Sequence, residues 1–316
     1  MRLLVEARTR VTPQMALGIL EGAASRRANE VLLLCSPSIS DRVAEICRLK
    51  GVGYLDEGGN CHMEGPGLFI HVEGKGNLHP DTRPAGDPFA TKSSRIVRLL
   101  LSEPHRGWQV QELARQADVS LGLVARVKQT LVEQALAEVR DRRVYARDPE
   151  DLLAAWSRAY QAPAERLSYY VMDKPADVER RIRDWCASHN ARYALTHFSG
   201  AWRVAPMVRY NHATLYVDVP PRDGLQPLVE DIGAKLVETG SNLSLWIPHD
   251  EFVFHGARVI EGLQVASPLQ LYLDLANTPG RGAEASQEIL EREIRPTWQL
   301  TKHTATTRRL RHADLS

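Results

Sequence analysis

The sequence predicts a multidomain α/β protein in which a small helical unit with a hairpin separates two α/β parts. Its 316 residues are enough for two or three domains. Apolar residues at helical spacing alternate with short strand-like runs toward both ends of the chain. Between them, residues 77–91 hold Pro80, Pro84 and Pro88, which cannot continue a helix or a central strand. This stretch is therefore expected to be a linker.

The first part, residues 1–88 including most of the linker, is expected to be a small α/β domain. Residues 31–35 are an apolar run suited to a buried strand, and residues 38–50 carry apolar side chains at helical spacing after a serine-rich start. Three short strands fit at about 51–57, 60–64 and 68–74. A Gly-Gly pair and a Pro-Gly pair separate them.

The central part, residues 89–160, predicts three helices followed by a hairpin. Helices are expected at 93–102 and 109–117, and a third begins after the N-cap Ser120 and runs to about 134. The next residues alternate apolar and polar around a charged tip, as in a two-stranded hairpin. This order is that of a winged helix-turn-helix, which binds double-stranded DNA.

The third helix of this unit is predicted to read DNA bases. Val124, Val127 and Leu131 form one apolar stripe that should face the other two helices. The outward positions are then Ser120, Leu121, Gly122, Ala125, Arg126 and Gln129. Arginine suits guanine edges and glutamine suits adenine, while the small residues allow close approach of the backbone.

The hairpin is predicted to position the protein on the DNA backbone. Its arginines, Arg140, Arg142 and Arg143, suit phosphate or minor-groove contacts. The formal net charge of the chain is only +1, but residues 91–148 hold 11 Lys and Arg against 7 Asp and Glu, so the rest sums to −3. The alternative is that the unit binds only another protein, with these arginines in solvent.

The third part, residues 161–300, predicts a larger α/β domain. A helix is expected at about 175–189, and helices return at 268–276 and 283–294. Strand-like runs lie between them at 192–198, 213–219, 243–247 and 252–260. Residues 301–316 are polar and basic without apolar periodicity, and a mobile tail is expected there.

The sequence predicts neither a metal site nor a membrane segment. The four cysteines form no CxxC pair and the eleven histidines show no metal-ligand spacing, so reduced thiols and no cofactor are expected. The sequence contains no apolar run of 18 residues, and its first residues are not an apolar signal segment. Neither membrane insertion nor secretion is therefore expected. A cytoplasmic protein is the expectation.

Three stretches of the chain resemble one protein family. Residues 51–76, GVGYLDEGGNCHMEGPGLFIHVEGKG, look like the N-terminal region of AbiEi-type antitoxins of abortive-infection, type IV toxin-antitoxin systems. YALTHFSGAWRVAPM and VASPLQLYLDLANTPGRGAEA are similar to that family's C-terminal domain. The central position of the winged helix goes with its larger members. The resemblance implies a transcriptional autorepressor whose functional partner is a nucleotidyltransferase-like toxin, with no direct complex required.

The N-terminal stretch also resembles the restriction-endonuclease-like fold. Asp56 ends one expected strand, and Glu73 and Lys75 follow another, an Asp…Glu-x-Lys arrangement. Two carboxylates on neighbouring strands could hold Mg²⁺ while the lysine activates water. The preceding helix supplies no third ligand, so a vestigial site is favoured. A Mg²⁺-dependent endonuclease targeted by the winged helix is the alternative function.

The C-terminal part offers a second possible catalytic motif. HFSGAW is similar to the Gly-Ser turn of nucleotidyltransferases, and Asp218 and Asp223 follow it. Phosphoryl transfer by two metal ions needs acids about two residues apart on one strand. The spacing of five, interrupted by two prolines, does not meet this requirement, so a catalytically silent domain is expected.

Overall fold

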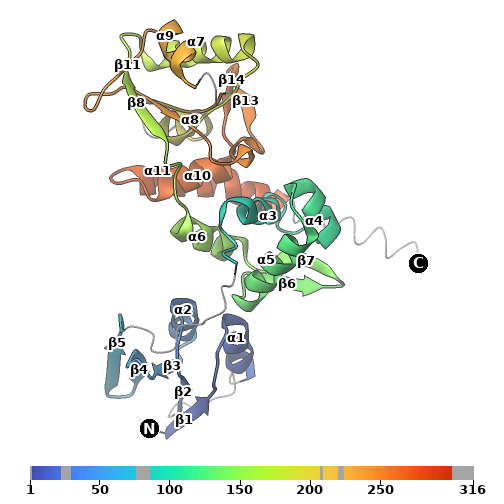
Figure 1. Ribbon diagram of the computed structural model, residues 1–316. Coiled ribbons are helices and arrows are strands. Elements are labelled where there is room, and N and C mark those ends of the chain that lie inside the picture. The colour runs from blue at the N-terminus through green and yellow to red at the C-terminus, as the bar shows by residue number, and fades with distance from the viewer. Residues whose placement is uncertain (1, 23–29, 76–85, 207–208, 220–223, 301–316) are drawn as a thin grey trace.

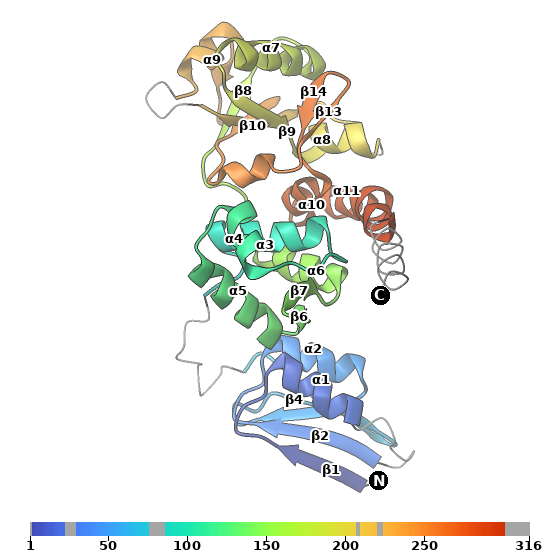
Figure 2. The same ribbon diagram turned by 90° about the vertical axis from the view of Figure 1, so that its right-hand side faces the viewer.

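The protein consists of three parts that follow one another along the molecule, in the order of the chain (Figures 1 and 2). This computed structural model describes residues 2–22, 30–75, 86–206, 209–219 and 224–300. The prediction of a multidomain α/β protein is confirmed. No helix in these ranges is both long and apolar enough to cross a membrane.

The first part is a five-stranded sheet with two helices. The strands lie in the order of the sequence; the first three are parallel, and the last two continue antiparallel. The elements are β1 (Arg2–Ala7), α1 (Pro13–Gly22), β2 (Glu30–Ser36), α2 (Asp41–Leu49), β3 (Gly53–Asp56), β4 (Cys61–Gly65) and β5 (Leu68–Val72). Of these, β1 and α1 were not among the sequence predictions.

The first part has its own small core between its helices and one face of the sheet. Leu34 and Tyr54 of the sheet pack there with Val43 and Cys47 of α2. Helix α2 begins where the serine-rich start predicted, because the Ser40 side chain accepts a hydrogen bond from the Val43 N–H. Edge strand β1 leaves Leu3 and Val5 about half exposed.

The middle part contains the predicted helices and hairpin in the predicted order. They are α3 (Thr91–Ser102), α4 (Val110–Ala117), α5 (Leu121–Glu133), β6 (Ala137–Arg140) and β7 (Arg143–Ala146), followed by α6 (Pro149–Ala159). Asp148 caps α6 by accepting from the N–H groups of Glu150 and Asp151. Residues 86–90, at the end of the predicted linker, form neither helix nor strand.

The third part is built on a seven-stranded mixed sheet with the order β11-β8-β12-β10-β9-β14-β13. Its strands are β8 (Arg166–Tyr170), β9 (Arg192–Leu195), β10 (Ala213–Asp218), β11 (Lys235–Leu236), β12 (Leu243–Trp246), β13 (Arg258–Ile260) and β14 (Leu263–Val265). Its helices are α7 (Pro175–Ser188), α8 (His197–Val204), α9 (Gln226–Asp231), η1 (Glu251–Phe254), α10 (Pro268–Ala276) and α11 (Gly282–Ile289), which continues as η2 (Leu290–Ile294).

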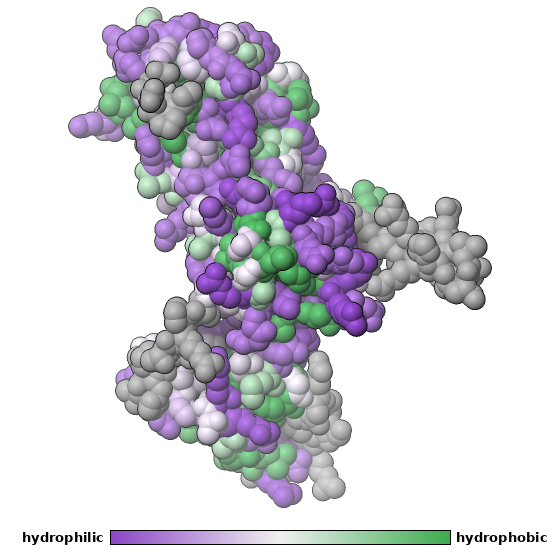
Figure 3. All heavy atoms as spheres, turned by 45° about the vertical axis from the view of Figure 1, so that its right-hand side comes forward, coloured by the Kyte–Doolittle hydropathy of each residue, from purple (hydrophilic) through white to green (hydrophobic). Residues whose placement is uncertain are grey.

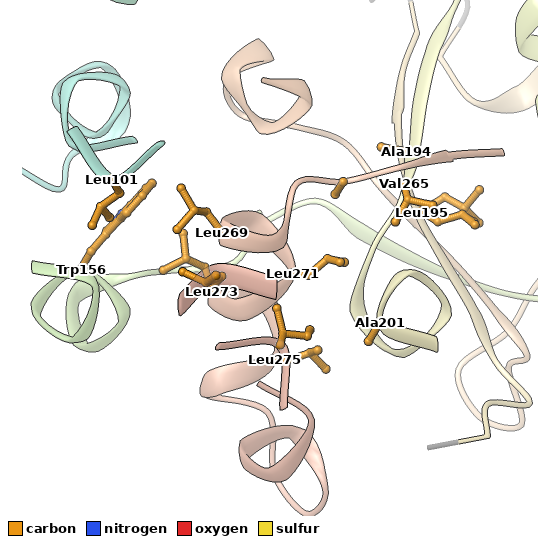
Figure 4. Packing of buried hydrophobic residues seen from close by; sticks show 14 of the residues in the cluster. Leu101, Trp156, Ala194, Leu195, Ala201, Val265, Leu269, Leu271, Leu273 and Leu275 are labelled. Carbon is orange, nitrogen blue, oxygen red and sulfur yellow. The ribbon is translucent and has the colours of Figure 1, made fainter. Parts of the chain in front are cut away.

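Helix α10 joins the middle and third parts into one hydrophobic core. Leu269 and Leu273 lie toward Leu101 and Trp156 of the middle part, and other leucines of α10 lie toward the sheet (Figure 4). Trp298 adds a polar tie, since its indole N–H donates to the Leu101 carbonyl at 2.7 Å. The residues on the two sides of the predicted boundary at residue 160 therefore share one hydrophobic core.

Two predictions fall partly or wholly outside the described residues. Most of the predicted linker, residues 77–85, and the predicted tail, residues 301–316, are not described.

The four cysteines are free thiols, and burial raises the pKa of Cys47 to about 11 and that of Cys186 to about 12.

Candidate nucleic-acid interface

Helix α5 is fixed in the middle part by its cap and by one apolar stripe. The Ser120 side chain accepts a hydrogen bond from the Leu123 N–H at 3.2 Å, which starts the helix. Val124, Val127 and Leu131 are at most 2% exposed. The preceding turn contains Asp118, whose φ of 52° ends α4 in the left-handed region. The end of α4 and the start of α5 are thus both specified by local sequence.

The structure brings the six predicted base-reading positions together on the exposed face of α5. These are Ser120, Leu121, Gly122, Ala125, Arg126 and Gln129. A Cβ atom added at Gly122 would meet no atom within 4 Å, so the backbone is open there. Arg126 makes no hydrogen bond or ion pair with any described residue, whereas the Gln129 amide donates to Glu133 at 2.8 Å. Their role in DNA binding stays a prediction.

The hairpin after α5 projects a basic tip (Figure 1). Asp141 and Arg142 form its two-residue turn with φ of 49° and 59°, as a tight hairpin of matching twist requires. Arg140 and Arg143 are direct cross-strand partners. Trp108 adds a short antiparallel bridge to Val144 on the outer side of β7.

The three hairpin arginines differ in what holds them. Arg140 pairs with Glu138 at 2.7 Å and lies over the Tyr145 ring. Arg143 donates to the Gly107 carbonyl at 2.9 Å. Arg142 has no such partner within the described part of the chain. Of the three, Arg142 is therefore the most available for an external anion.

The predicted excess of basic charge in the middle part is partly internal. Arg95 and Arg98 are only 7% and 4% exposed, because α3 is covered on several sides by α4, α6 and α10. Counting them toward a DNA-facing surface was wrong. The middle part still presents many hydrophilic side chains around α4, α5 and the hairpin (Figure 3).

The Asp56, Glu73 and Lys75 cluster lies at the carboxyl ends of the parallel strands of the first part. Asp56 is buried and accepts from the backbone N–H and side-chain amide of Asn60, both at 2.9 Å. Glu73 accepts from Arg48 and, at 2.7 Å, from the Tyr54 hydroxyl. These bonds occupy both carboxylates within the domain.

The expectation that Asp56 and Glu73 end neighbouring strands is wrong. Strand β4 lies between β3 and β5, and its flanking residue Asn60 bonds to both Asp56 and the backbone of Lys75. Among the described residues, no group of three His, Cys, Asp or Glu side chains could hold a metal ion. An amide thus stands between the predicted nuclease residues.

A cavity of about 870 Å³ separates this cluster from the end of α5. Its walls include Asp56, Glu73 and Lys75 of the first part and Thr130 and Glu133 of α5. Besides these walls, Arg42 pairs with Asp151, and Arg147 donates to Gln14 at 3.0 Å. The first part therefore contacts the middle part near the C-terminal end of α5 and after the hairpin. The N-terminal half of α5 stays exposed.

The nucleotidyltransferase-like motif of the third part is occupied by structural bonds. The Ser199 hydroxyl lies within hydrogen-bond distance of the carbonyls of Thr196 and Thr214, to either of which its single hydrogen can donate, and it accepts from the Thr214 N–H. Asp218 accepts two hydrogen bonds from Arg192. Asp223 lies outside the described residues.

A buried polar network between the middle and third parts was missed from the sequence. The Asp274 carboxylate, 5% exposed, accepts from Thr196, from Gln270, and from the hydroxyls of Tyr160 and Tyr216. Burial raises the pKa of Asp274 although these four donors act in the opposite direction. The available signal was a Gln and an Asp four residues apart on an otherwise apolar helix.

Comparison with protein families matches residues 143–295 to the transcriptional regulator described as the AbiEi antitoxin of type IV toxin-antitoxin systems. This part of the chain is similar to the AbiEi family. The resemblance found in the sequence is thereby confirmed for residues 143–295. Neither the curated proteins nor the solved structures gave a match.

The AbiEi match has a definite relation to the structure. It begins at the first residue of β7 and includes α6 and the third part up to η2. The Asp274 network therefore lies inside the AbiEi region, whereas α5 and the first part precede it. The family is one of regulators rather than enzymes.

Proposed function

We propose that this protein is a sequence-specific, double-stranded DNA-binding autorepressor, the antitoxin of a type IV toxin-antitoxin locus. The observation that carries the proposal is the outer face of α5, which is exposed and lies beside a basic hairpin. Ser120 caps the helix at its N-terminus. The order of three helices followed by a hairpin, with the Trp108 bridge beside it, is the order expected of a winged helix-turn-helix and supports the proposal. The AbiEi match to a transcriptional regulator supports it.

In this proposal the N-terminal half of α5 enters the major groove. The open backbone at Gly122 allows close approach, and the Arg126 guanidinium, without an internal partner in the described chain, suits the O6 and N7 atoms of guanine. Gln129 reads adenine only after its amide leaves Glu133. Arg126 is therefore the main base-reading side chain of the proposal.

The hairpin supplies backbone contacts in this proposal. Like charges at cross-strand positions are destabilising, so the pairing of Arg140 with Arg143 does not serve the hairpin itself. With Arg142 between them, the three side chains concentrate positive charge where DNA phosphates would lie. Such contacts fix the position of the protein on the duplex rather than its sequence preference.

The proposed partners follow from the AbiEi assignment. The DNA partner is the operator of the protein's own promoter, and the functional partner is a nucleotidyltransferase-like toxin that needs no direct complex with it. The proposed location is the cytoplasm, where the operator is found, and the proposed activity uses no cofactor.

Binding of duplex DNA by the full chain tests the proposal. The full chain is required because the middle part shares its core with α10 and an isolated 89–160 fragment would expose Leu101 and Trp156. We expect tighter binding to promoter DNA than to a scrambled duplex, and weaker binding to both as salt rises. If the protein bound neither promoter DNA nor the scrambled duplex at low salt, a protein-binding role for the middle part would be favoured.

A further inference from the structure

A second cavity, of about 350 Å³, lies between the middle and third parts. Its apolar wall includes the aromatic side chains Phe89, Trp156, Tyr160 and Phe252. Its polar residues include Arg98 from the middle part and Gln270 from the third part. Aromatic side chains beside polar groups that can orient a ligand, at a junction between domains, are typical of small-molecule sites.

Arg98 is a buried cation without a carboxylate partner in the described chain. Its guanidinium donates only to neutral oxygens, those of Ser267 at 3.4 Å and Gln270, and lies 5.0 Å from the Trp156 ring centre. Burying a charge without a counter-ion is costly. Arg95, one turn earlier on the same helix, is equally buried but pairs with Asp250 at 2.9 Å.

The carboxylates near Arg98 are already engaged. Asp274 is reached only through Gln270 and accepts from four donors. Asp250 is bound by Arg95 and by the Phe252 N–H, and Asp87 by the Phe89 N–H. The guanidinium has five N–H donors, of which these contacts use two. An anion in the cavity could accept the others.

The start of α3 also favours an anion in this cavity. The N-cap residue Ala90 supplies no side-chain cap, and the first turn contains no acidic residue. Thr91 and Ser94 line the cavity with Arg98, at positions that share one face of the helix. The uncapped N–H groups and the positive end of the helix dipole therefore lie on the same side as the guanidinium.

We propose that this cavity binds a small aromatic carboxylate, with its carboxylate on Arg98 and its ring against the aromatic wall. Arginine offers a planar fork that matches a carboxylate, and a ring would occupy the apolar space beside Trp156 and Phe252. Because α3 and α10 both contribute, the bound molecule would contact the middle and third parts at once.

Thermal unfolding of the full chain in benzoate, compared with chloride and phosphate at equal ionic strength, tests this site. We expect benzoate at ten times its Kd to raise Tm by roughly 2–6 °C, and chloride and phosphate to do less. A benzoate effect no larger than that of chloride would overturn the proposal. An equal effect of phosphate would overturn the assigned ligand class.

Two variants locate the effect. Ser94→Glu places a carboxylate in the cavity one turn before Arg98, so Tm should rise without ligand and the benzoate effect should disappear. Arg98→Gln should also lose it, and Ser94→Glu decides the test if Arg98→Gln does not fold. Ser102→Glu, outside the cavity lining on the same helix, is the matched control and should respond like the wild type. An unchanged benzoate effect in Ser94→Glu would contradict the proposal.

Discussion

Arg98 of α3 and Asp274 of α10 are both almost completely buried and are connected through a single amide. Gln270 accepts a hydrogen bond from Arg98 with its oxygen and donates to Asp274 with its nitrogen at 2.9 Å. This relay crosses from the middle part into the AbiEi region. It makes the junction between the two parts polar and specific as well as hydrophobic.

The first prediction concerns this relay. Gln270→Met removes the amide to which the buried Arg98 and Asp274 side chains both bond, so the free energy of unfolding should fall by about 2–4 kcal/mol. Gln287→Met is the control, because its amide makes the same i, i+4 bond to Glu291 on an exposed surface. Its loss should stay within about 0.5 kcal/mol. Equal losses in denaturant titrations would show that the buried relay has no special role.

The second prediction concerns stability in acid. Burial, helped by His212 and Arg166, lowers the pKa of His197 from 6.5 to about 4. The unfolded chain therefore binds a proton between these values that the folded protein does not. The stability from neutral His197 is complete above pH 6.5 and is lost as the pH falls toward 4.

His197→Asn tests this contribution. Asparagine tolerates the φ of 53° at this position and carries no group that titrates between pH 4 and pH 7. Between pH 7 and pH 4 the wild type should lose about 2–3 kcal/mol more unfolding free energy than the variant. Identical pH profiles in chemical denaturation would rule out the contribution.

The third prediction separates stability from DNA binding at the hairpin tip. Arg142 has a positive φ, which costs a non-glycine residue about 1–2 kcal/mol. Arg142→Gly should therefore raise the free energy of unfolding while it weakens binding to all duplexes and flattens the salt dependence by about one unit. A stabilised variant with unchanged DNA affinity would remove Arg142 from the interface.

The fourth prediction concerns the nuclease alternative. Asp56→Asn and Glu73→Gln should leave duplex binding nearly unchanged, because both carboxylates are held by neighbours within the first part. Asp56→Asn should lower the stability of that part by about 1–2 kcal/mol through the lost turn bonds. Mg²⁺- or Mn²⁺-dependent nicking that disappears in both variants would instead establish the endonuclease.

The sequence predicted the parts of the fold that depend on local signals. The face of α5 followed from the spacing of Val124, Val127 and Leu131, and the hairpin from its alternation. Strand β1 was missed because an edge strand keeps a mixed apolar and charged pattern on its exposed sides. Asp56 and Glu73 do not end neighbouring strands, as the sequence had suggested, because β4 lies between β3 and β5 in the sheet.

The buried polar residues could not be predicted in the same way. Arg95 and Arg98 belong to a helix that is covered on several sides, which its sequence pattern alone does not show. The partners of Asp274 lie far away in sequence, Tyr160 by 114 residues and Thr196 by 78. Only the three-dimensional fold places them in one network.

The most direct test of the central claim compares Arg126→Ala with wild type on promoter DNA and on a scrambled duplex. A bidentate arginine–guanine contact is worth about 1–3 kcal/mol, so promoter affinity should fall roughly 5- to 150-fold, with a much smaller loss on the scrambled duplex. Arg158→Ala, at an exposed position on α6, is the control and should change neither affinity. Equal losses on both duplexes would contradict base reading by α5 and make Arg126 a phosphate contact.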